Sequence, residues 1–90
     1  MKIHGVKGAI TVQDNSAEAI MQASAELLEE LIRRNNINQE DVAAVFFTTS
    51  PDLTAEFPAR VARERIKWDN VPLMCSHEMH KNGALQKCIR

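Results

Sequence analysis

The sequence predicts a mixed α/β domain, and three observations support that fold class. Segments of strand composition alternate with segments of helical periodicity, in the order strand, helix, strand, helix, strand. The stretches between successive strands are long enough for the crossover connections that parallel or mixed pairing requires. The 90 residues fit a single domain, residues 1–90, and no repeat or linker divides them.

The first two elements are a strand that contains glycines and a long amphipathic helix. Residues 2–12 have strand composition, and glycines such as Gly8 indicate a bulge or a close approach by a ligand or another backbone. Asn15 and Glu18 match a capping box, which predicts a helix over residues 16–34. The apolar positions of that helix recur at i, i+3 and i+4 and are Ile20, Ala23, Leu27, Leu28, Leu31 and Ile32.

Shorter elements follow the long helix. Asn36 tolerates the left-handed conformation and ends that helix. Residues 42–49 are largely apolar, which predicts a strand buried on both faces. Pro58 suits the first turn of a second helix, predicted over residues 58–66. The remaining predicted elements are a short turn capped by Asn38, a strand over 71–76, a turn at 82–83, one helical turn over 84–87 and the start of a strand at 88–90.

The composition argues against several classes of protein. A net charge of −1 gives no basic face for nucleic acid, so no nucleic-acid partner is expected. The longest apolar run, residues 42–47, is far below the roughly 18 residues of a membrane span. Two cysteines are too few for a disulfide framework, and a cytoplasmic protein with free thiols is expected. A chain of this length buries only about 60–65% of its surface, so oligomerisation is an ordinary source of additional stability.

Polar residues at the start of the second helix suggest an anion site. The free N–H groups and partial positive charge of a helix N-terminus favour a carboxylate, and Arg60 adds a full charge there. An exposed first-turn arginine with no ligand is the plainer interpretation, and residues 57–60 alone do not decide between the two.

A second group of polar residues ends the strand predicted at 71–76. Cys75 and His77 would share one face of a strand, so a thiol nucleophile with a base is one alternative. No oxyanion hole or orienting third group accompanies them. A metal site is a second alternative, but the donors Cys75, His77, His80 and Cys88 do not have a recurrent zinc spacing, and no metal site is predicted.

Several segments occur together in an order that is more specific than any one of them. They are Lys-Gly-Ala-Ile-Thr-Val at 7–12, Thr-Ser-Pro-Asp-Leu at 49–53, Phe-Pro-Ala-Arg at 57–60, Val-Pro-Leu-Met-Cys at 71–75 followed by Glu78, and Gly-Ala-Leu-Gln-Lys-Cys-Ile-Arg at 83–90. In this combination the whole chain resembles the monofunctional, trimer-forming chorismate mutases of the short bacterial type.

The resemblance implies a mixed sheet with helices, a homotrimer likened to a barrel, and active sites in clefts between neighbouring subunits. It also implies conversion of chorismate to prephenate without metal or cofactor, in the branch of the shikimate pathway that leads to phenylalanine and tyrosine. The reaction is a pericyclic rearrangement, so it requires no nucleophile or general base. The protein instead holds a flexible dianion in a reactive conformation and stabilises the charge that develops on the breaking ether oxygen.

The resemblance also assigns roles to individual residues by position. Arg90 is assigned as the cation on the ether oxygen and a nearby carboxylate, a task that suits an always-charged guanidinium. Glu78 is assigned as the acceptor of a hydrogen bond from the ring hydroxyl, with Cys75 as a weaker partner. The other predicted substrate-binding residues are Lys7 and the wall residues Phe57, Ala59, Arg60, Leu73 and Met74.

The chain departs from the family pattern in two ways. Lys7 stands where the family usually has an arginine that grips a substrate carboxylate, and losing the bidentate fork is expected to weaken binding by about 1–2 kcal/mol. Family chains continue past the position of Arg90 with a strand whose tyrosine contacts substrate, and this sequence contains no tyrosine. Either a fragment or a shortened relative is therefore expected. The alternative function is that of a non-catalytic trimeric relative that binds a small carboxylate.

Overall fold

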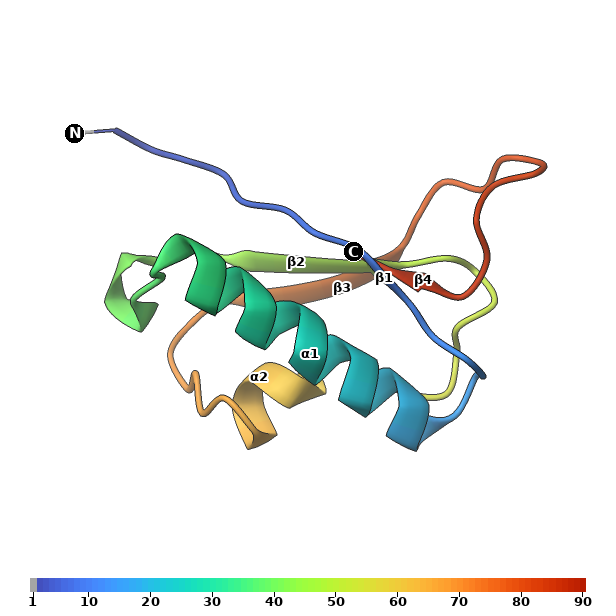
Figure 1. Ribbon diagram of the computed structural model, residues 1–90, viewed down its shortest axis with the longest axis horizontal. Coiled ribbons are helices and arrows are strands. Elements are labelled where there is room, and N and C mark those ends of the chain that lie inside the picture. The colour runs from blue at the N-terminus through green and yellow to red at the C-terminus, as the bar shows by residue number, and fades with distance from the viewer. Residues whose placement is uncertain (1) are drawn as a thin grey trace.

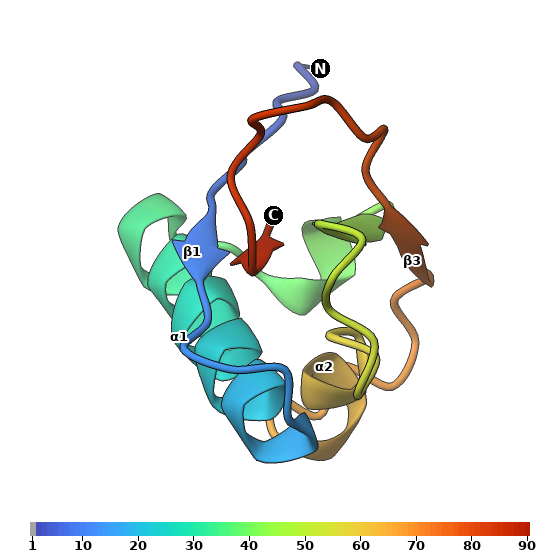
Figure 2. The same ribbon diagram turned by 90° about the vertical axis from the view of Figure 1, so that its right-hand side faces the viewer.

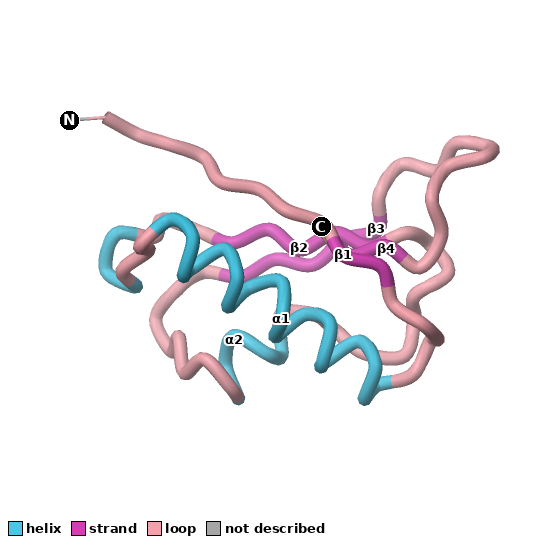
Figure 3. The backbone as a smooth tube through the Cα atoms, viewed as in Figure 1, coloured by secondary structure: helices cyan, strands magenta, loops and turns pink. Residues whose placement is uncertain are grey.

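The sheet of the computed structural model, which describes residues 2–90, has the strand order β1-β4-β2-β3. β2 and β3 pair in parallel, whereas β4 is antiparallel to both β1 and β2 (Figures 1 and 3). The predicted mixed fold class is confirmed, as are a strand after residue 71 and a strand beginning at residue 88. The strands are β1 (Ile10–Thr11), β2 (Val45–Thr49), β3 (Leu73–His77) and β4 (Cys88–Ile89).

The long helix α1 (Ala17–Asn35) agrees with its prediction, but its N-terminal cap does not. Ser16 is the capping residue, because its hydroxyl oxygen accepts a hydrogen bond from the backbone N–H of Ala19. The predicted cap, Asn15, instead bonds a distant loop. At the other end, Asn36 has a left-handed backbone conformation, as predicted.

Two of the predicted strands are shorter or less buried than expected. Of residues 2–12, Ile10 and Thr11 pair with a neighbouring strand, and the segment before them runs extended above α1. The predicted strand over 42–49 begins at Val45, because the backbone of Val42 closes the 3-10 turn Gln39–Asp41. Its burial on both faces was predicted wrongly, since α1 and α2 lie on the same face of the sheet (Figure 2).

The second helix and the predicted helical turn at 84–87 also differ from expectation. The second helix, α2 (Arg60–Glu64), is five residues long, and residues 58–59 form a turn before it. Lys67 has a positive φ of 65° and ends this region. Residues 84–87 form no helical turn, because Lys87 is also left-handed and donates its backbone N–H to the carboxylate of Asp52. The turn at 82–83 is confirmed, with Gly83 at φ 82°.

The core lies between the sheet and the two helices. One buried cluster joins α1, α2 and β2, and it includes Leu28, Phe47, Val61 and Trp68. A second cluster joins α1 to β4 through residues such as Ile20 and Ile89. Both clusters lie on the helix side of the sheet, so the opposite face of β2 and β3 is free to present other side chains.

Candidate active site

Glu78 and Arg90, the two residues predicted to be catalytic, lie side by side next to the end of β2. Glu78 follows β3 directly, and its N–H donates to the backbone oxygen of Thr49 at 2.8 Å. Arg90 follows β4, and its backbone exchanges two hydrogen bonds with Thr48, each 2.8 Å long. Arg90 Nε lies 2.8 Å from Glu78 Oε1, with the two side chains 51% and 35% exposed. The strands β3 and β4, which lie on either side of β2, thus bring an anion and a cation to one place.

Thr48 is a third member of this group, and no role was predicted for it from the sequence. Its hydroxyl donates to the same oxygen of Glu78, at 2.7 Å. The side chain points away from the helices, because Phe47 and Thr49 on either side of it are buried on the helix face. The alternation of the strand could have revealed this orientation, but the strand was predicted to be buried on both faces.

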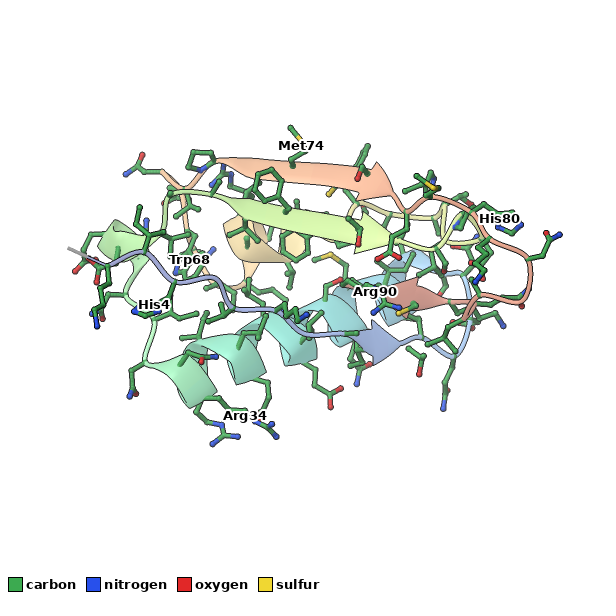
Figure 4. All side chains as sticks on the ribbon, turned by 90° about the horizontal axis from the view of Figure 1, so that it is seen from above. His4, Arg34, Trp68, Met74, His80 and Arg90 are labelled. Carbon is green, nitrogen blue, oxygen red and sulfur yellow. The ribbon has the colours of Figure 1, made fainter. Side chains whose placement is uncertain are left out.

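The predicted wall residues on β3 divide between the two faces of the sheet. Leu73 and Cys75 pack against the core cluster beneath β2. Met74 points to the opposite face and is 59% exposed. Figure 4 looks onto this face and shows Met74 over β3 and Arg90 at the end of β4. Of these three predicted residues, Met74 shares the exposed face with Thr48.

The turn into α2 carries the other predicted wall residues. Phe57 is 69% exposed, whereas Ala59 packs against the core. Arg60 forms ion pairs with Glu56 and Glu64, one helical turn away on either side, and these carboxylates raise the pKa of its guanidinium. The Arg60 charge is therefore satisfied within its own helix surface rather than directed at Glu78 and Arg90.

Lys7 forms no ion pair with Glu78 in the part of the chain that the structure describes. It belongs to the extended segment before β1 and is exposed, and within residues 2–90 it forms no hydrogen bond or ion pair. The neighbouring Gly8 approaches α1 closely, since a Cβ atom added there would lie 3.0 Å from Leu27 and 3.3 Å from Leu31. Gly8 thus sets the path of the segment that presents Lys7.

A shallow pocket adjoins Glu78. It has a volume of about 180 Å³ and lies between the end of β2 and the loop that joins β3 to β4. Ligand pockets usually measure about 300–1,000 Å³, so this one does not enclose a substrate of chorismate's size by itself. Its lining residues are Ser50, Pro51, Glu78, Met79, His80, Gly83, Ala84, Leu85 and Gln86.

Hydrogen bonds between loops fix the chain just before Arg90. Ser50 Oγ accepts from the N–H of Cys88 at 2.9 Å, and Asp52 Oδ2 accepts from the N–H of Lys87 at 2.9 Å. The Ser50 hydroxyl also bonds the Asp52 carboxylate, and together with the backbone bonds it lowers the pKa of Asp52. Ser50 and Asp52 belong to the motif at residues 49–53, but their role in fixing this segment was not predicted.

The geometry does not support the two alternatives based on Cys75 and His77. His77 Nδ1 lies 3.0 Å from the hydroxyl of Thr49, so the imidazole is engaged elsewhere. Burial raises the pKa of the Cys75 thiol, which disfavours the thiolate that a nucleophile needs. No three His, Cys, Asp or Glu side chains among residues 2–90 are placed to hold a metal ion.

Comparison with known proteins gives the family of this chain. Residues 3–90 match the family model of chorismate mutase type I. The chain belongs to the chorismate mutase type I family. It is 43% identical over 90 residues to chorismate mutase AroH of Bacillus subtilis (strain 168), and this match covers the whole chain and 71% of that relative. It is 44% identical over 89 residues to chorismate mutase AroH of Thermus thermophilus, covering 98% of the chain and 72% of that relative.

A solved structure agrees with this assignment. The chorismate mutase from Clostridium thermocellum has a TM-score of 0.86 and 40% sequence identity, covering 90% of this chain and 71% of its own. Membership in the chorismate mutase family confirms the predicted resemblance, the fold and the enzyme class. Among residues 2–90, no helix has both the length and the apolar character needed to cross a membrane.

Proposed function

We propose that this chorismate mutase family member converts chorismate to prephenate without a metal or cofactor, in aromatic amino acid biosynthesis. The observation that supports this best is the Arg90 guanidinium placed 2.8 Å from the Glu78 carboxylate, in a chain that matches the family over residues 3–90. A fixed cation beside a fixed hydrogen-bond acceptor is what a rearranging dianion requires, and neither group has to react.

In the proposed mechanism Arg90 and Glu78 bind different groups of the substrate. Arg90 uses Nε for Glu78, and its two terminal amino groups form no hydrogen bond within residues 2–90. These amino groups are free to donate hydrogen bonds to the ether oxygen of the substrate, where negative charge develops, and to an adjacent carboxylate of the substrate. Glu78 accepts the hydrogen bond of the ring hydroxyl. Cys75, the predicted weaker partner, lies three residues before Glu78, and its side chain packs against the core cluster. Substrate bound in this way is compact before the bond breaks.

The proposal includes a homotrimer whose neighbouring subunits complete each site. Three large apolar side chains support it, since Phe46, Phe57 and Met74 are 66%, 69% and 59% exposed. The pocket beside Glu78 is also too small for the substrate without further walls. Lys7, exposed on its extended segment, supplies a cation to a substrate carboxylate in this arrangement. The proposal treats residues 1–90 as one domain in the cytoplasm.

The test measures loss of chorismate absorbance with the purified 90-residue chain, without added metal and in the presence of a chelator. Light scattering gives the mass of the assembly in the same buffer. A second chain, extended at its C-terminus by a family-like segment, is measured in parallel. Turnover by the 90-residue chain as a trimer is the expected result.

Two other outcomes have definite meanings. Turnover by the extended chain alone would show that the site needs residues beyond Arg90. If both chains are folded and trimeric and neither turns over, the enzyme proposal is wrong. Binding of chorismate by such an inactive trimer, measured by calorimetry, would establish the alternative of a carboxylate-binding relative.

A further inference from the structure

Thr48 touches both members of the Glu78–Arg90 pair. Through its backbone it exchanges two hydrogen bonds with Arg90, both 2.8 Å long. Through its hydroxyl it donates to Glu78 Oε1 at 2.7 Å. One residue of β2 is therefore bonded to both groups, although Glu78 and Arg90 follow different strands. Thr48 thus holds the Arg90 backbone and the Glu78 carboxylate at one point of β2.

One carboxylate oxygen of Glu78 contacts both residues. Thr48 Oγ1 donates a hydrogen bond to Oε1, and Arg90 Nε forms an ion pair with the same oxygen at 2.8 Å. Within residues 2–90, Oε2 forms no hydrogen bond, and the Glu78 side chain is about one third exposed. Because Oε1 is already engaged by Thr48 and Arg90, Oε2 is the oxygen left to accept a hydrogen bond from a ligand.

A threonine suits this task for conformational reasons. A free glutamate side chain loses up to about 1.5–2 kcal/mol of rotamer entropy when it is fixed. The branched Thr48 side chain has few χ1 rotamers of its own, so it offers a nearly rigid donor. Fixing the carboxylate before substrate arrives removes that cost from the binding and rearrangement steps.

We propose that Thr48 is a positioning residue, whose hydroxyl orients Glu78 so that Oε2 accepts the hydroxyl of the substrate's ring while Arg90 remains alongside. This inference rests on the proposed function. A purely structural role for Thr48 predicts a different result, because valine has nearly the same shape and suits a strand equally well. Removing only the hydroxyl therefore distinguishes a positioning role for Thr48 from a purely structural one.

The experiment compares Thr48→Val with Thr48→Ser, using kcat/KM for chorismate. Thr48→Val is expected to lose about 10- to 100-fold, the range of a hydrogen bond to a charged group, and Thr48→Ser to recover most of that loss. Thr11→Val, at an exposed strand position of β1, is the matched control. A Thr48→Ser loss as large as that of Thr48→Val would overturn the proposal.

A double-mutant cycle tests whether Thr48 acts through Glu78. In a Glu78→Ala background, Thr48→Val is expected to change kcat/KM by less than about two-fold, because the group that it positions is gone. The same 10- to 100-fold loss in that background would show that Thr48 acts on something else.

A spectroscopic measurement separates this inference from the proposed function. The side-chain carboxyl carbon of Glu78, observed by 13C NMR at pH 8 and assigned with Glu78→Ala, is expected to shift in Thr48→Val and to stay near its wild-type position in Thr48→Ser. If neither the 90-residue chain nor the extended chain turns over chorismate, the proposed function fails, and this signal still decides whether the Thr48 hydroxyl orients Glu78. An unchanged Glu78 signal in Thr48→Val would overturn the inference even in an active enzyme.

Discussion

Replacing Arg90 with alanine removes the cation beside Glu78 and leaves the fold nearly untouched. The ion pair is half exposed, and such pairs contribute about 0–1 kcal/mol to the free energy of unfolding. The two backbone hydrogen bonds between Arg90 and Thr48 do not depend on the side chain. We therefore expect the Arg90→Ala chain to fold and assemble as the wild type does, so that any loss of activity reports on chemistry.

Two effects set the expected size of that loss. Removing a preorganised donor at a developing oxyanion costs about 10²- to 10³-fold in kcat. Glu78 is also left as an unpaired carboxylate facing a dianion, and two like charges about 4 Å apart repel by roughly 4 kcal/mol at an effective dielectric of 20. Together these effects predict a loss of about 10⁵- to 10⁶-fold in kcat/KM. Adding Glu78→Gln to Arg90→Ala removes the repulsion, so the double variant is expected to be about ten-fold or more faster than Arg90→Ala alone.

The assay follows chorismate absorbance at several substrate concentrations, with light scattering on the same samples. Arg34→Ala is the matched control, because Arg34 is exposed and pairs with Glu30 on the surface of α1. Arg90→Lys tests whether the planar guanidinium is needed as well as the positive charge, since lysine keeps the charge but offers no planar pair of donors. A loss of only a few-fold in an intact Arg90→Ala trimer would refute the role assigned to Arg90.

Three further predictions follow from single residues. Lys7→Arg is expected to lower KM by about 5- to 30-fold with little change in kcat, and an unchanged KM in steady-state kinetics would remove Lys7 from the carboxylate site. Asp52 has a lowered pKa in the folded chain, so its stabilising effect is present above its unfolded pKa of about 3.9 and is lost as the pH falls through the folded value. Urea unfolding from pH 7 to 3 should therefore show wild type more stable than Asp52→Asn at neutral pH and the gap closing below about pH 4; a gap that does not depend on pH would contradict this. Ser24 is fully buried and its Oγ has no hydrogen-bond partner within residues 2–90, so Ser24→Ala is expected to raise the free energy of unfolding by about 1 kcal/mol at fixed protein concentration, whereas a loss would mean that the hydroxyl is bonded in the assembly.

The elements predicted best were those whose signals are local. The bounds of α1 were predicted to within one residue, because an apolar period of 3.6 runs along it and Asn36 ends it. The N-terminal cap was wrong because the side chain of Asn15 bonds Thr54 and Ala55, about 40 positions away in the sequence. No local pattern around Asn15 shows that competing partner, so Ser16 takes the cap.

The candidate site also combines features that the sequence predicts with features that depend on the folded chain. Glu78 and Arg90 were predicted from the family resemblance, and the structure places them in contact. The ion pairs of Arg60 could have been predicted as well, since Glu56 and Glu64 lie four positions before and after it, the spacing of neighbours on a helix surface. The pocket beside Glu78 could not be predicted, because its lining residues, from positions 50–51 and 78–86, come together only in the folded chain.

The most informative error concerns β2, because it hid Thr48. An apolar run of strand length was taken to be buried on both faces, yet successive residues of β2 alternate between the core and the open face. Phe47 and Thr49 point towards the helices, whereas Phe46 and Thr48 point away from them. Since a one-residue shift in pairing would exchange the two sets, the hydrophobic demand for Phe47 in the core also determines that Thr48 faces Glu78. Core packing on one face of β2 thus fixes the geometry of the polar group on the other.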